Sequence, residues 1–195
     1  MHRQGLIAGL DGNVSARLPD GRFLATPSAS HLGVLEPEDL LVVTLDGTVQ
    51  HAGSGRVTSE WAMHRACYQR PDVDAVFHAH PVHVVARSLD GEDMPDGVLP
   101  EVVVAIGPVP TVPYATTGTG ELAKAVGDAI ATHNAVVLER HGAVTVGTTI
   151  QQACARMEAL EHAARILCAT RTPPTALPTD ECERLARIGA ALGSV

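Results

Sequence analysis

Long apolar runs, basic stretches and a leader segment are all missing from this sequence. No apolar run approaches the roughly 20 residues that a helix needs to span a membrane. Lys and Arg total 14 against 22 Asp and Glu, a formal net charge of −8, so no basic stripe is present to neutralise the phosphates of a nucleic acid. The start, Met1 to Gly5, lacks the charged-then-apolar pattern of a secretion signal. We therefore expect a cytoplasmic protein with neither a nucleic-acid nor a membrane partner.

Cysteine and aromatic residues are few. The four cysteines show no C-x-x-C spacing: Cys67, Cys154, Cys168 and Cys182. Two of them fall on expected helices rich in Ala and Leu, where a thiol behaves as a small buried apolar group, so we expect reduced cysteines rather than a disulfide framework. Aromatic residues make up 3% of the chain and include only two Tyr. A Tyr inside a site motif is for that reason a candidate functional group.

Strand and turn patterns come first along the chain. Residues 13–18 and 22–26 flank a Pro-Asp-Gly turn, and residues 40–44 and 48–50 flank the turn Asp46-Gly47. Each pair of segments predicts a β-hairpin.

The remaining segments alternate between strand and helix patterns. Thr58 or Ser59 can cap a helix that runs to about Arg70, with Glu60 in its first turn. In chain order, the other expected segments are a buried strand over 74–80, a polar loop over 90–100, an apolar run over 102–106, a helix over 119–133, two strands within 135–146 that break at His141-Gly142, and a long helix over 149–169. This order predicts an α/β fold, a three-layer α/β/α sandwich with helices on both faces of a mostly antiparallel sheet. The 195 residues, 45% of them hydrophobic, fit one domain over 1–195, with 172–195 as a C-terminal tail.

The sharpest signal for chemistry is the H-x-H pair in Val76-Phe77-His78-Ala79-His80-Pro81. Residues i and i+2 of a strand share a face, so His78 and His80 project side by side. Two neutral imidazoles on one face form half of a tetrahedral zinc site. Pro81 ends the strand and places the pair at an edge or mouth of the sheet. Alone, the pair could also be two solvent-facing histidines.

Two further residues extend the pair. His141 stands at the end of another strand, and Glu60 lies at a helix start, where the helix dipole and backbone donors favour a carboxylate. Three imidazoles and a carboxylate can close a metal site around an exchangeable position. Rival H-x-H folds fit poorly, because an amidohydrolase barrel needs roughly 250 residues and a cupin needs a Glu soon after the pair, whereas the nearest here is Glu92.

Small polar residues at turns form a candidate anion site. Gly12-Asn13 opens the first strand, Thr26-Pro27-Ser28 closes the second, and Thr58-Ser59 precedes Glu60. Hydroxyls, an amide and free backbone N–H groups at a helix start can hold a dianionic phosphate without Lys or Arg. Taken singly, each residue is ordinary capping or turn chemistry, and only the combination supports the interpretation.

Other residues receive plainer interpretations. We expect a packing or surface role for His64, with a place beside the site as the alternative, and a packing or surface role for His83. Arg140 is interpreted as an ion-pair partner and Trp61 as a core residue.

Together these segments resemble the class II aldolase and adducin head family, and they occur in the family's order over most of the chain. The matching segments are Gly12-Asn13-Val14-Ser15, Thr26-Pro27-Ser28, Thr58-Ser59-Glu60-Trp61, His78-Ala79-His80-Pro81, Pro113-Tyr114-Ala115-Thr116-Thr117-Gly118 and His141-Gly142. The resemblance implies that Zn²⁺ or another divalent metal is held by His78, His80 and His141. Glu60 would be both the catalytic base and a possible fourth ligand.

The resemblance also implies a substrate site shared between subunits. The substrate phosphate would be held by Asn13, Ser28, Thr58 and Ser59. Tyr114 matches the family's tyrosine acid, which comes from a neighbouring subunit of a ring-shaped homotetramer, so the active sites lie at subunit interfaces. Some positions depart from the family: Leu10 and Asp11 stand where Thr or Ser is usual, Ala29 stands where Gly is common, and the tail has no Tyr.

The implied reaction is that of a class II aldehyde-lyase of carbohydrate metabolism. It would cleave a ketose 1-phosphate similar to L-fuculose 1-phosphate into dihydroxyacetone phosphate and a small aldehyde. The alternative is a sugar-phosphate epimerase, dehydratase or decarboxylase with the same metal site, although the epimerases typically have Asp in place of Glu60. The adducin head lacks the metal ligands, which are all present here, so a non-catalytic module is disfavoured.

Overall fold

The computed structural model describes residues 1–51 and 55–193. Across these residues eight strands form one sheet in the order β4-β3-β2-β1-β5-β8-β7-β6. All neighbouring strands are antiparallel except β6 and β7. The strands are β1 (Asn13–Arg17), β2 (Phe23–Ala25), β3 (Leu41–Val43), β4 (Val49–His51), β5 (Ala75–Ala79), β6 (Thr111–Val112), β7 (Ala135–Leu138) and β8 (Gly142–Gly147).

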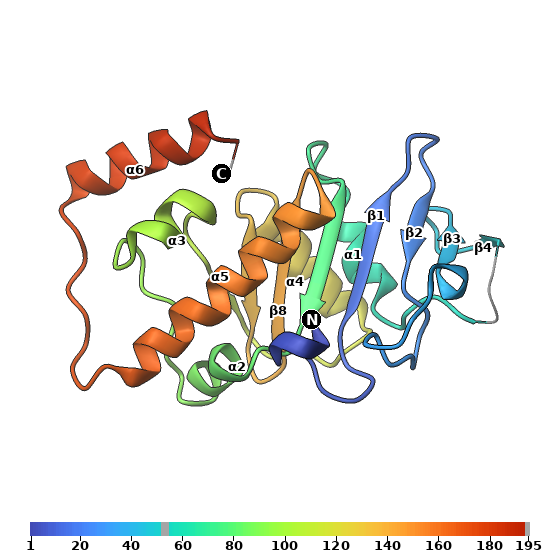
Figure 1. Ribbon diagram of the computed structural model, residues 1–195, viewed down its shortest axis with the longest axis horizontal. Coiled ribbons are helices and arrows are strands. Elements are labelled where there is room, and N and C mark those ends of the chain that lie inside the picture. The colour runs from blue at the N-terminus through green and yellow to red at the C-terminus, as the bar shows by residue number, and fades with distance from the viewer. Residues whose placement is uncertain (52–54, 194–195) are drawn as a thin grey trace.

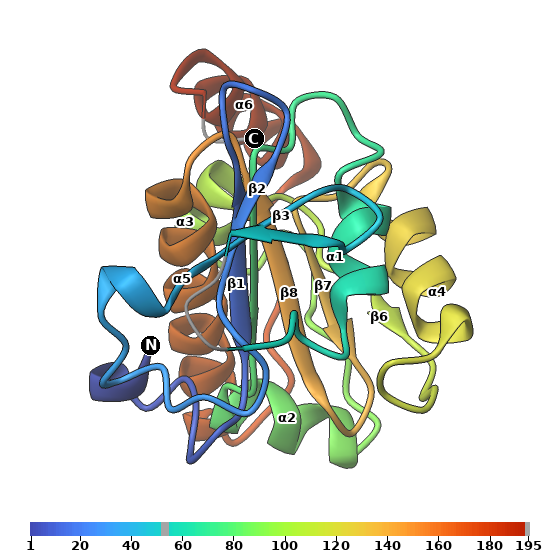
Figure 2. The same cartoon turned by 90° about the vertical axis from the view of Figure 1, so that its right-hand side faces the viewer.

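Helices cover both faces of this sheet. In Figure 2 the strands lie between the two helical layers, with α1 and α4 on one side and α3 and α5 on the other. The α-helices are α1 (Trp61–Cys67), α2 (Val82–Leu89), α3 (Pro100–Ala105), α4 (Gly120–Ile130), α5 (Ile150–Ala169) and α6 (Thr179–Ala191). Two short 3₁₀ helices, η1 (His2–Gln4) and η2 (Pro37–Asp39), lie in the N-terminal part. The predicted three-layer α/β/α fold with a mostly antiparallel sheet is confirmed.

Side-chain alternation in β5 divides the core into two halves. Ala75, Phe77 and Ala79 pack into the apolar cluster beneath α5, whereas Val76 packs into the cluster beneath α1 and α4. Because strand residues alternate between faces, His78 points to the same side as Val76. The strand therefore presents its first histidine to α1 from inside the core, where His78 is fully buried.

The local signals placed most elements correctly. Both hairpins are confirmed by antiparallel pairing of β1 with β2 and of β3 with β4. The long helices begin where expected, because the side chains of Thr119 and Thr149 accept backbone N–H groups of their own first turns. The helix expected from Thr58 to about Arg70 is shorter: α1 starts at Trp61 and ends at Cys67, with Glu60 as its N-cap residue rather than in its first turn.

Three elements differ from the expectation or lie outside it. The apolar run 102–106 lies mostly in a helix, α3, which starts with Pro100 in its first turn. Neither α2 nor β6 was predicted. Part of the C-terminal tail forms a helix, α6, which packs on α3. The assignment of 1–195 to one domain stays a prediction, and residues 194–195 of its tail lie outside the described residues.

Among the residues that the structure describes, none of the helices combines the length and the apolar character of a bilayer-crossing segment. The four cysteines are unpaired, and Cys67 is buried in the core. On the Ala- and Leu-rich helix α5, Cys154 is half-buried and Cys168 is exposed, so the expected burial is wrong for Cys168.

Candidate metal centre

Three histidines meet at one end of the central strands. His78 is the fourth residue of β5, His80 directly follows the strand, and His141 lies in the turn between β7 and β8. The antiparallel pairing of β5 with β8 sets Ala79 opposite Ala143, and this register brings the turn back beside the pair. The ring centroids are 4.9, 4.9 and 4.8 Å apart. One nitrogen from each ring lies within 4.8 Å of the others.

Gly142 makes this close approach possible. A Cβ atom at this position would lie 2.3 Å from the carbonyl oxygen of Ala79 and 2.8 Å from Cδ2 of His80. The contact with the Ala79 oxygen could be relieved only by moving a strand, because this oxygen belongs to the backbone. The glycine after His141 therefore permits the third imidazole to reach the other two.

The protonation of the rings indicates what the cluster can bind. Nδ1 of His78 lies 3.0 Å from the carbonyl oxygen of Ala143, which can only accept, so this nitrogen carries the hydrogen. Nδ1 of His80 faces the carboxylate of Asp11 at 3.5 Å, which favours a hydrogen there as well. Two Nε2 lone pairs then face each other 3.1 Å apart. In a tetrahedral zinc site with Zn–N bonds of 2.0–2.1 Å, neighbouring nitrogens are about 3.3 Å apart. The donor set therefore fits a divalent cation.

Glu60 completes the cluster from the start of α1. Its Oε2 lies 3.2 Å from Nε2 of His78, and its Oε1 lies 3.5 Å from Nε2 of His141. Asn13 donates its side-chain N–H to Oε2 at 3.0 Å. Within the described residues Oε1 is buried and has no hydrogen-bond partner. A buried carboxylate oxygen without a partner calls for an explanation, and a cation among the imidazoles supplies one.

The pKa values favour the metal-binding forms of these groups. Burial raises the pKa of Glu60, but the hydrogen bond and the charge of His78 outweigh burial and leave that pKa below its ordinary value. Burial, followed by the charge of His78, lowers the pKa of His141 to about 4. The same two causes lower the pKa of His80. At neutral pH, the ionised carboxylate thus lies among the neutral imidazoles of His80 and His141, which are in the form that binds metal.

The residues expected around a phosphate lie on adjacent segments. Pro27 forms an isolated antiparallel bridge with Val57, which places the turn carrying Ser28 beside the segment that leads to Thr58 and Ser59. Ser59 is exposed, whereas Thr58 is buried and accepts the backbone N–H of Glu60 at 3.2 Å.

The backbone conformation of the neighbouring residue explains one departure from the family pattern. Ala29 has a φ of 55°, in the left-handed region that glycine adopts most readily. The glycine that is common there in the family suits this conformation, and the alanine adopts it at some conformational cost.

Asn13 and Tyr114 occupy very different surroundings. The amide of Asn13 is buried, and both of its polar atoms are used, by Glu60 and by His64. Its contact with a phosphate therefore stays a prediction. Tyr114 is 58% exposed, and its hydroxyl makes no hydrogen bond within the described part of the chain. The backbone N–H of Tyr114 donates to Glu139 at 3.0 Å and fixes the turn that carries the ring.

Sequence reasoning missed two neighbours of the site. His64 is fully buried, which excludes a surface role but agrees with packing, and its hydrogen bond to Asn13 supports the alternative of a place beside the site. The available signal was its position one helical turn after Glu60, which puts both side chains on one face of α1. Asp11 was noted only as a departure from the family pattern, yet it faces His80.

The residues with plainer interpretations behave as expected. Trp61 packs in the core beneath α1, and Arg140 forms an ion pair with Glu139 at 3.3 Å. His83 pairs with Glu161 at 2.7 Å on the α5 side of the sheet, apart from the histidine cluster.

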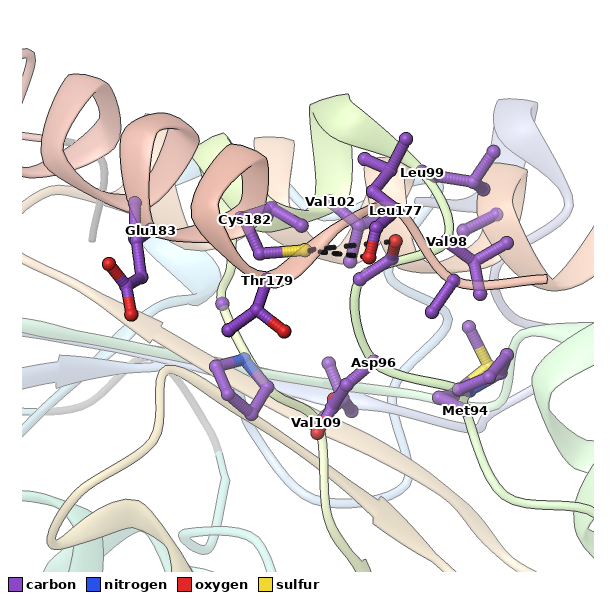
Figure 3. A pocket seen from close by; sticks show the side chains of 18 of the residues that line it. Met94, Asp96, Val98, Leu99, Val102, Val109, Leu177, Thr179, Cys182 and Glu183 are labelled. Atoms are coloured by element: carbon purple, nitrogen blue, oxygen red, sulfur yellow. Dashed lines mark hydrogen bonds between the residues drawn. The ribbon is translucent and has the colours of Figure 1, made fainter.

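A cavity of about 460 Å³ lies elsewhere in the molecule, between the 94–99 loop, α3, α5 and α6. Figure 3 shows that its lining is mostly apolar, with Val98, Leu99, Val102 and Leu177 around it. The thiol of Cys182 lies 3.8 Å from the carbonyl oxygen of Leu177. None of the residues expected in the site lines this cavity.

Comparison with known proteins agrees with this geometry. The family described as Class II Aldolase and Adducin N-terminal domain matches residues 1–168. The chain is 36% identical over 170 residues to 3-oxo-tetronate 4-phosphate decarboxylase from Escherichia coli O6:H1, covering 85% of this chain and 79% of that protein. It is 33% identical over 186 residues to L-fuculose phosphate aldolase from Escherichia coli K12, covering 93% of this chain and 84% of that protein.

A solved structure gives the same result at the level of the fold. The crystal structure of YgbL from Escherichia coli, described as a proposed aldolase/epimerase/decarboxylase, matches with a TM-score of 0.88 and 34% sequence identity. The match covers 95% of this chain and 91% of that one.

Proposed function

Because the chain belongs to the class II aldolase and adducin N-terminal domain family and is a metal-dependent enzyme of the lyase type, we propose that it cleaves a carbon–carbon bond. The bond lies next to a carbonyl group in a small phosphorylated sugar or sugar acid. One observation carries the proposal: Oε1 of Glu60 has no hydrogen-bond partner among the described residues and lies 3.5 Å from Nε2 of His141, in a cluster of three imidazoles with one nitrogen each within 4.8 Å of the others. This arrangement supports a role for the Glu60 carboxylate beside a metal-polarised carbonyl.

The proposed metal is Zn²⁺, or another divalent ion, held by His78, His80 and His141. Bound there, it supplies a Lewis acid that polarises the substrate carbonyl. The alternative aldolase chemistry, a Schiff base on lysine, lacks a suitable residue. The only lysine in the sequence is Lys124, whose side chain is 76% exposed and ion-paired with Asp128 on α4.

The protein's own groups divide the remaining work. Glu60 exchanges a proton with the carbon next to the carbonyl through its free Oε1, while Asn13 holds Oε2. Ser28, Thr58 and Ser59 hold the phosphate through hydroxyl and backbone N–H groups. Tyr114 of a neighbouring subunit exchanges a proton with the oxygen of the departing aldehyde. This proposal includes a cytoplasmic homotetramer with its sites at subunit interfaces.

The first candidate reaction is aldol cleavage. A ketose 1-phosphate similar to L-fuculose 1-phosphate would give dihydroxyacetone phosphate and a small aldehyde. The exposed phenol of Tyr114 supports this candidate, because cleavage to an aldehyde requires a group that handles the proton of the departing hydroxyl.

The second candidate is decarboxylation of a phosphorylated 3-oxo acid. The specific observation in its favour is the 36% identity to 3-oxo-tetronate 4-phosphate decarboxylase. Loss of CO₂ leaves the same kind of electron-rich carbon next to a polarised carbonyl, so one set of residues serves either reaction.

A substrate panel separates the candidates. Protein loaded with Zn²⁺ is incubated with several ketose 1-phosphates and with 3-oxo acid phosphates, and the products are identified. Dihydroxyacetone phosphate plus aldehyde supports the first candidate, and CO₂ supports the second. The Glu60→Gln protein, loaded in the same way, is the matched control for background decay. Turnover of no panel member, with metal bound, contradicts the proposal.

A further inference from the structure

A buried chain of polar side chains leads away from Glu60 into the core. It joins α1 to β1 and consists of Glu60, Asn13, His64, Ser15 and Tyr68, all of which are buried. The chain lies among apolar residues beneath α1, where a polar group without a partner is costly. Each member is therefore expected to have a hydrogen-bond partner, and the distances show which one.

The contacts form a continuous series. Nδ2 of Asn13 lies 3.0 Å from Oε2 of Glu60, and Oδ1 of Asn13 lies 2.5 Å from Nε2 of His64. Nδ1 of His64 lies 2.7 Å from the hydroxyl of Ser15. That hydroxyl lies 2.6 Å from the phenol oxygen of Tyr68. Four hydrogen bonds thus link the core to the carboxylate.

Only one direction of donation satisfies every member. An ionised carboxylate can only accept, so Asn13 turns its N–H₂ to Glu60 and its oxygen to His64. Nε2 of His64 must then carry a hydrogen. Among the described residues the phenol of Tyr68 has Ser15 as its one hydrogen-bond partner, so its O–H donates to the oxygen of Ser15. The O–H of Ser15 then donates to Nδ1 of His64, which accepts as the second nitrogen of a neutral ring.

We propose that His64 is a positioning residue for the catalytic carboxylate, acting through the amide of Asn13. A free amide could rotate by half a turn and present its oxygen to Glu60, which would repel the carboxylate. The Nε2–H of His64 prevents this rotation, and Ser15 and Tyr68 fix the tautomer that provides it. Oε2 of Glu60 is thereby held while Oε1 stays free toward the histidine cluster. The inference rests on the proposed role of Glu60.

The first test reads the direction of the chain without any substrate. In ¹⁵N-labelled, zinc-loaded protein, the ring nitrogens of His64 should show the Nε2–H tautomer. Ser15→Ala removes the group that donates to Nδ1 and should weaken or abolish that preference. An Nδ1–H tautomer in the parent protein would overturn the proposal.

The second test separates positioning from simple packing. His64→Leu fills the space but cannot donate, so kcat should fall about 10- to 100-fold, while KM and zinc content change less than twofold. His64→Gln can place an N–H near the lost Nε2–H and should recover most of kcat. His83→Leu, which also removes an imidazole, is the control and should keep parental kcat. A kcat within twofold of the parent in His64→Leu would overturn the proposal.

A double mutant distinguishes failure of this inference from failure of the proposed function. If His64 acts through Glu60, adding His64→Leu to Glu60→Gln should lower kcat by less than twofold further. A further loss equal to that of His64→Leu alone overturns the positioning role only. Normal turnover in Glu60→Gln overturns the proposed function itself. If His64→Leu does not fold, Ser15→Ala replaces it, and a kcat loss below threefold with zinc retained contradicts the inference.

Discussion

The histidine cluster and the cavity beneath α6 differ in almost every property that matters for chemistry. The cluster is tightly packed and polar, and the lone pairs of its nitrogens converge. The cavity encloses about 460 Å³ and is lined mostly by apolar side chains. Open volume is usually the first guide to a site. Here the better guide is the combination of converging histidine nitrogens with a buried carboxylate oxygen, Oε1 of Glu60, that has no hydrogen-bond partner among the described residues, because such an atom is costly unless something binds it.

The largest effect is expected from His80→Ala. This change removes one of two facing Nε2 atoms, so the metal and all activity should be lost. The fold should survive, because the ring of His80 is partly exposed and outside the two apolar clusters. Metal content by elemental analysis and far-UV circular dichroism check both parts. Full metal occupancy in this variant would rule out the assigned ligand set.

Glu60→Gln should separate chemistry from metal binding within the cluster. The three imidazoles remain, so the protein should retain its metal. Turnover should fall on the order of 10²–10⁴-fold, the usual contribution of a general base. Steady-state kinetics and elemental analysis on the same sample provide the measurement. Turnover close to that of the parent would show that the free Oε1 has another purpose.

Mixing two inactive proteins tests whether the cluster is complete within one chain. Glu60→Gln and Tyr114→Phe chains are refolded together in equal amounts. If Tyr114 serves the neighbouring subunit in a closed ring, about a quarter of the sites should pair an intact Glu60 with an intact Tyr114. If Tyr114 serves its own subunit, every site carries one lesion. No recovery of activity, or a monomer by light scattering, would contradict the shared site.

Acid should weaken the histidine region selectively. In the folded chain burial lowers the pKa of His64 to about 3 and that of His141 to about 4, whereas an imidazole in an unfolded chain has a pKa of about 6.5. The unfolded chain takes up protons first, so the stabilisation is complete above about pH 6.5 and is lost as the pH falls toward 4. At pH 5 each ring should lower the free energy of unfolding by on the order of 2 kcal/mol relative to its value above pH 6.5.

Urea unfolding of chelator-treated protein at pH 5 and pH 7.5 measures this loss. His64→Leu removes one of the rings whose pKa burial lowers and should show a shallower decline between the two pH values. Unfolding midpoints that do not change with pH would contradict the burial of neutral rings.

The smallest effect is expected at the cavity. Leu177→Ala shortens a side chain that lines it and should lower the free energy of unfolding by about 1 kcal/mol, because the residue is only partly buried. The kcat should be unchanged, since no expected site residue lines the cavity. Thermal unfolding and steady-state kinetics check this. A fall in kcat of more than threefold would contradict the expectation that the cavity has no part in catalysis.

Local sequence signals predicted the parts of the molecule that local physics determines. The hairpins follow from turn residues between alternating segments, and α4 and α5 start at threonines that cap them with their own side chains. The paired direction of His78 and His80 follows from strand alternation alone. These features need no knowledge of the rest of the chain.

Long-range contacts determine what the sequence could not predict. The start of α2 has no cap of its own, because Pro81 stands there; instead Glu161 of α5 accepts the N–H groups of His83 and Val84. His64 gained its place beside the site from Asn13, which is 51 residues away in the sequence. Because these partners are distant in the sequence, no local sequence pattern predicts the start of α2 or the position of His64 beside the site.

Gly142 has a consequence for the choice of ion. The spacing between His80 and His141 depends on main-chain contact between β5 and β8, since a single added carbon would meet the Ala79 carbonyl. Because backbone contacts set the spacing of the ligand nitrogens, this spacing changes little on binding. A metal site with fixed ligand spacing selects among metal ions by their radius. An alanine at this position would force the strands apart and widen the cage. We expect such a variant to bind larger ions relatively better than zinc, so the residue without a side chain would tune metal selectivity.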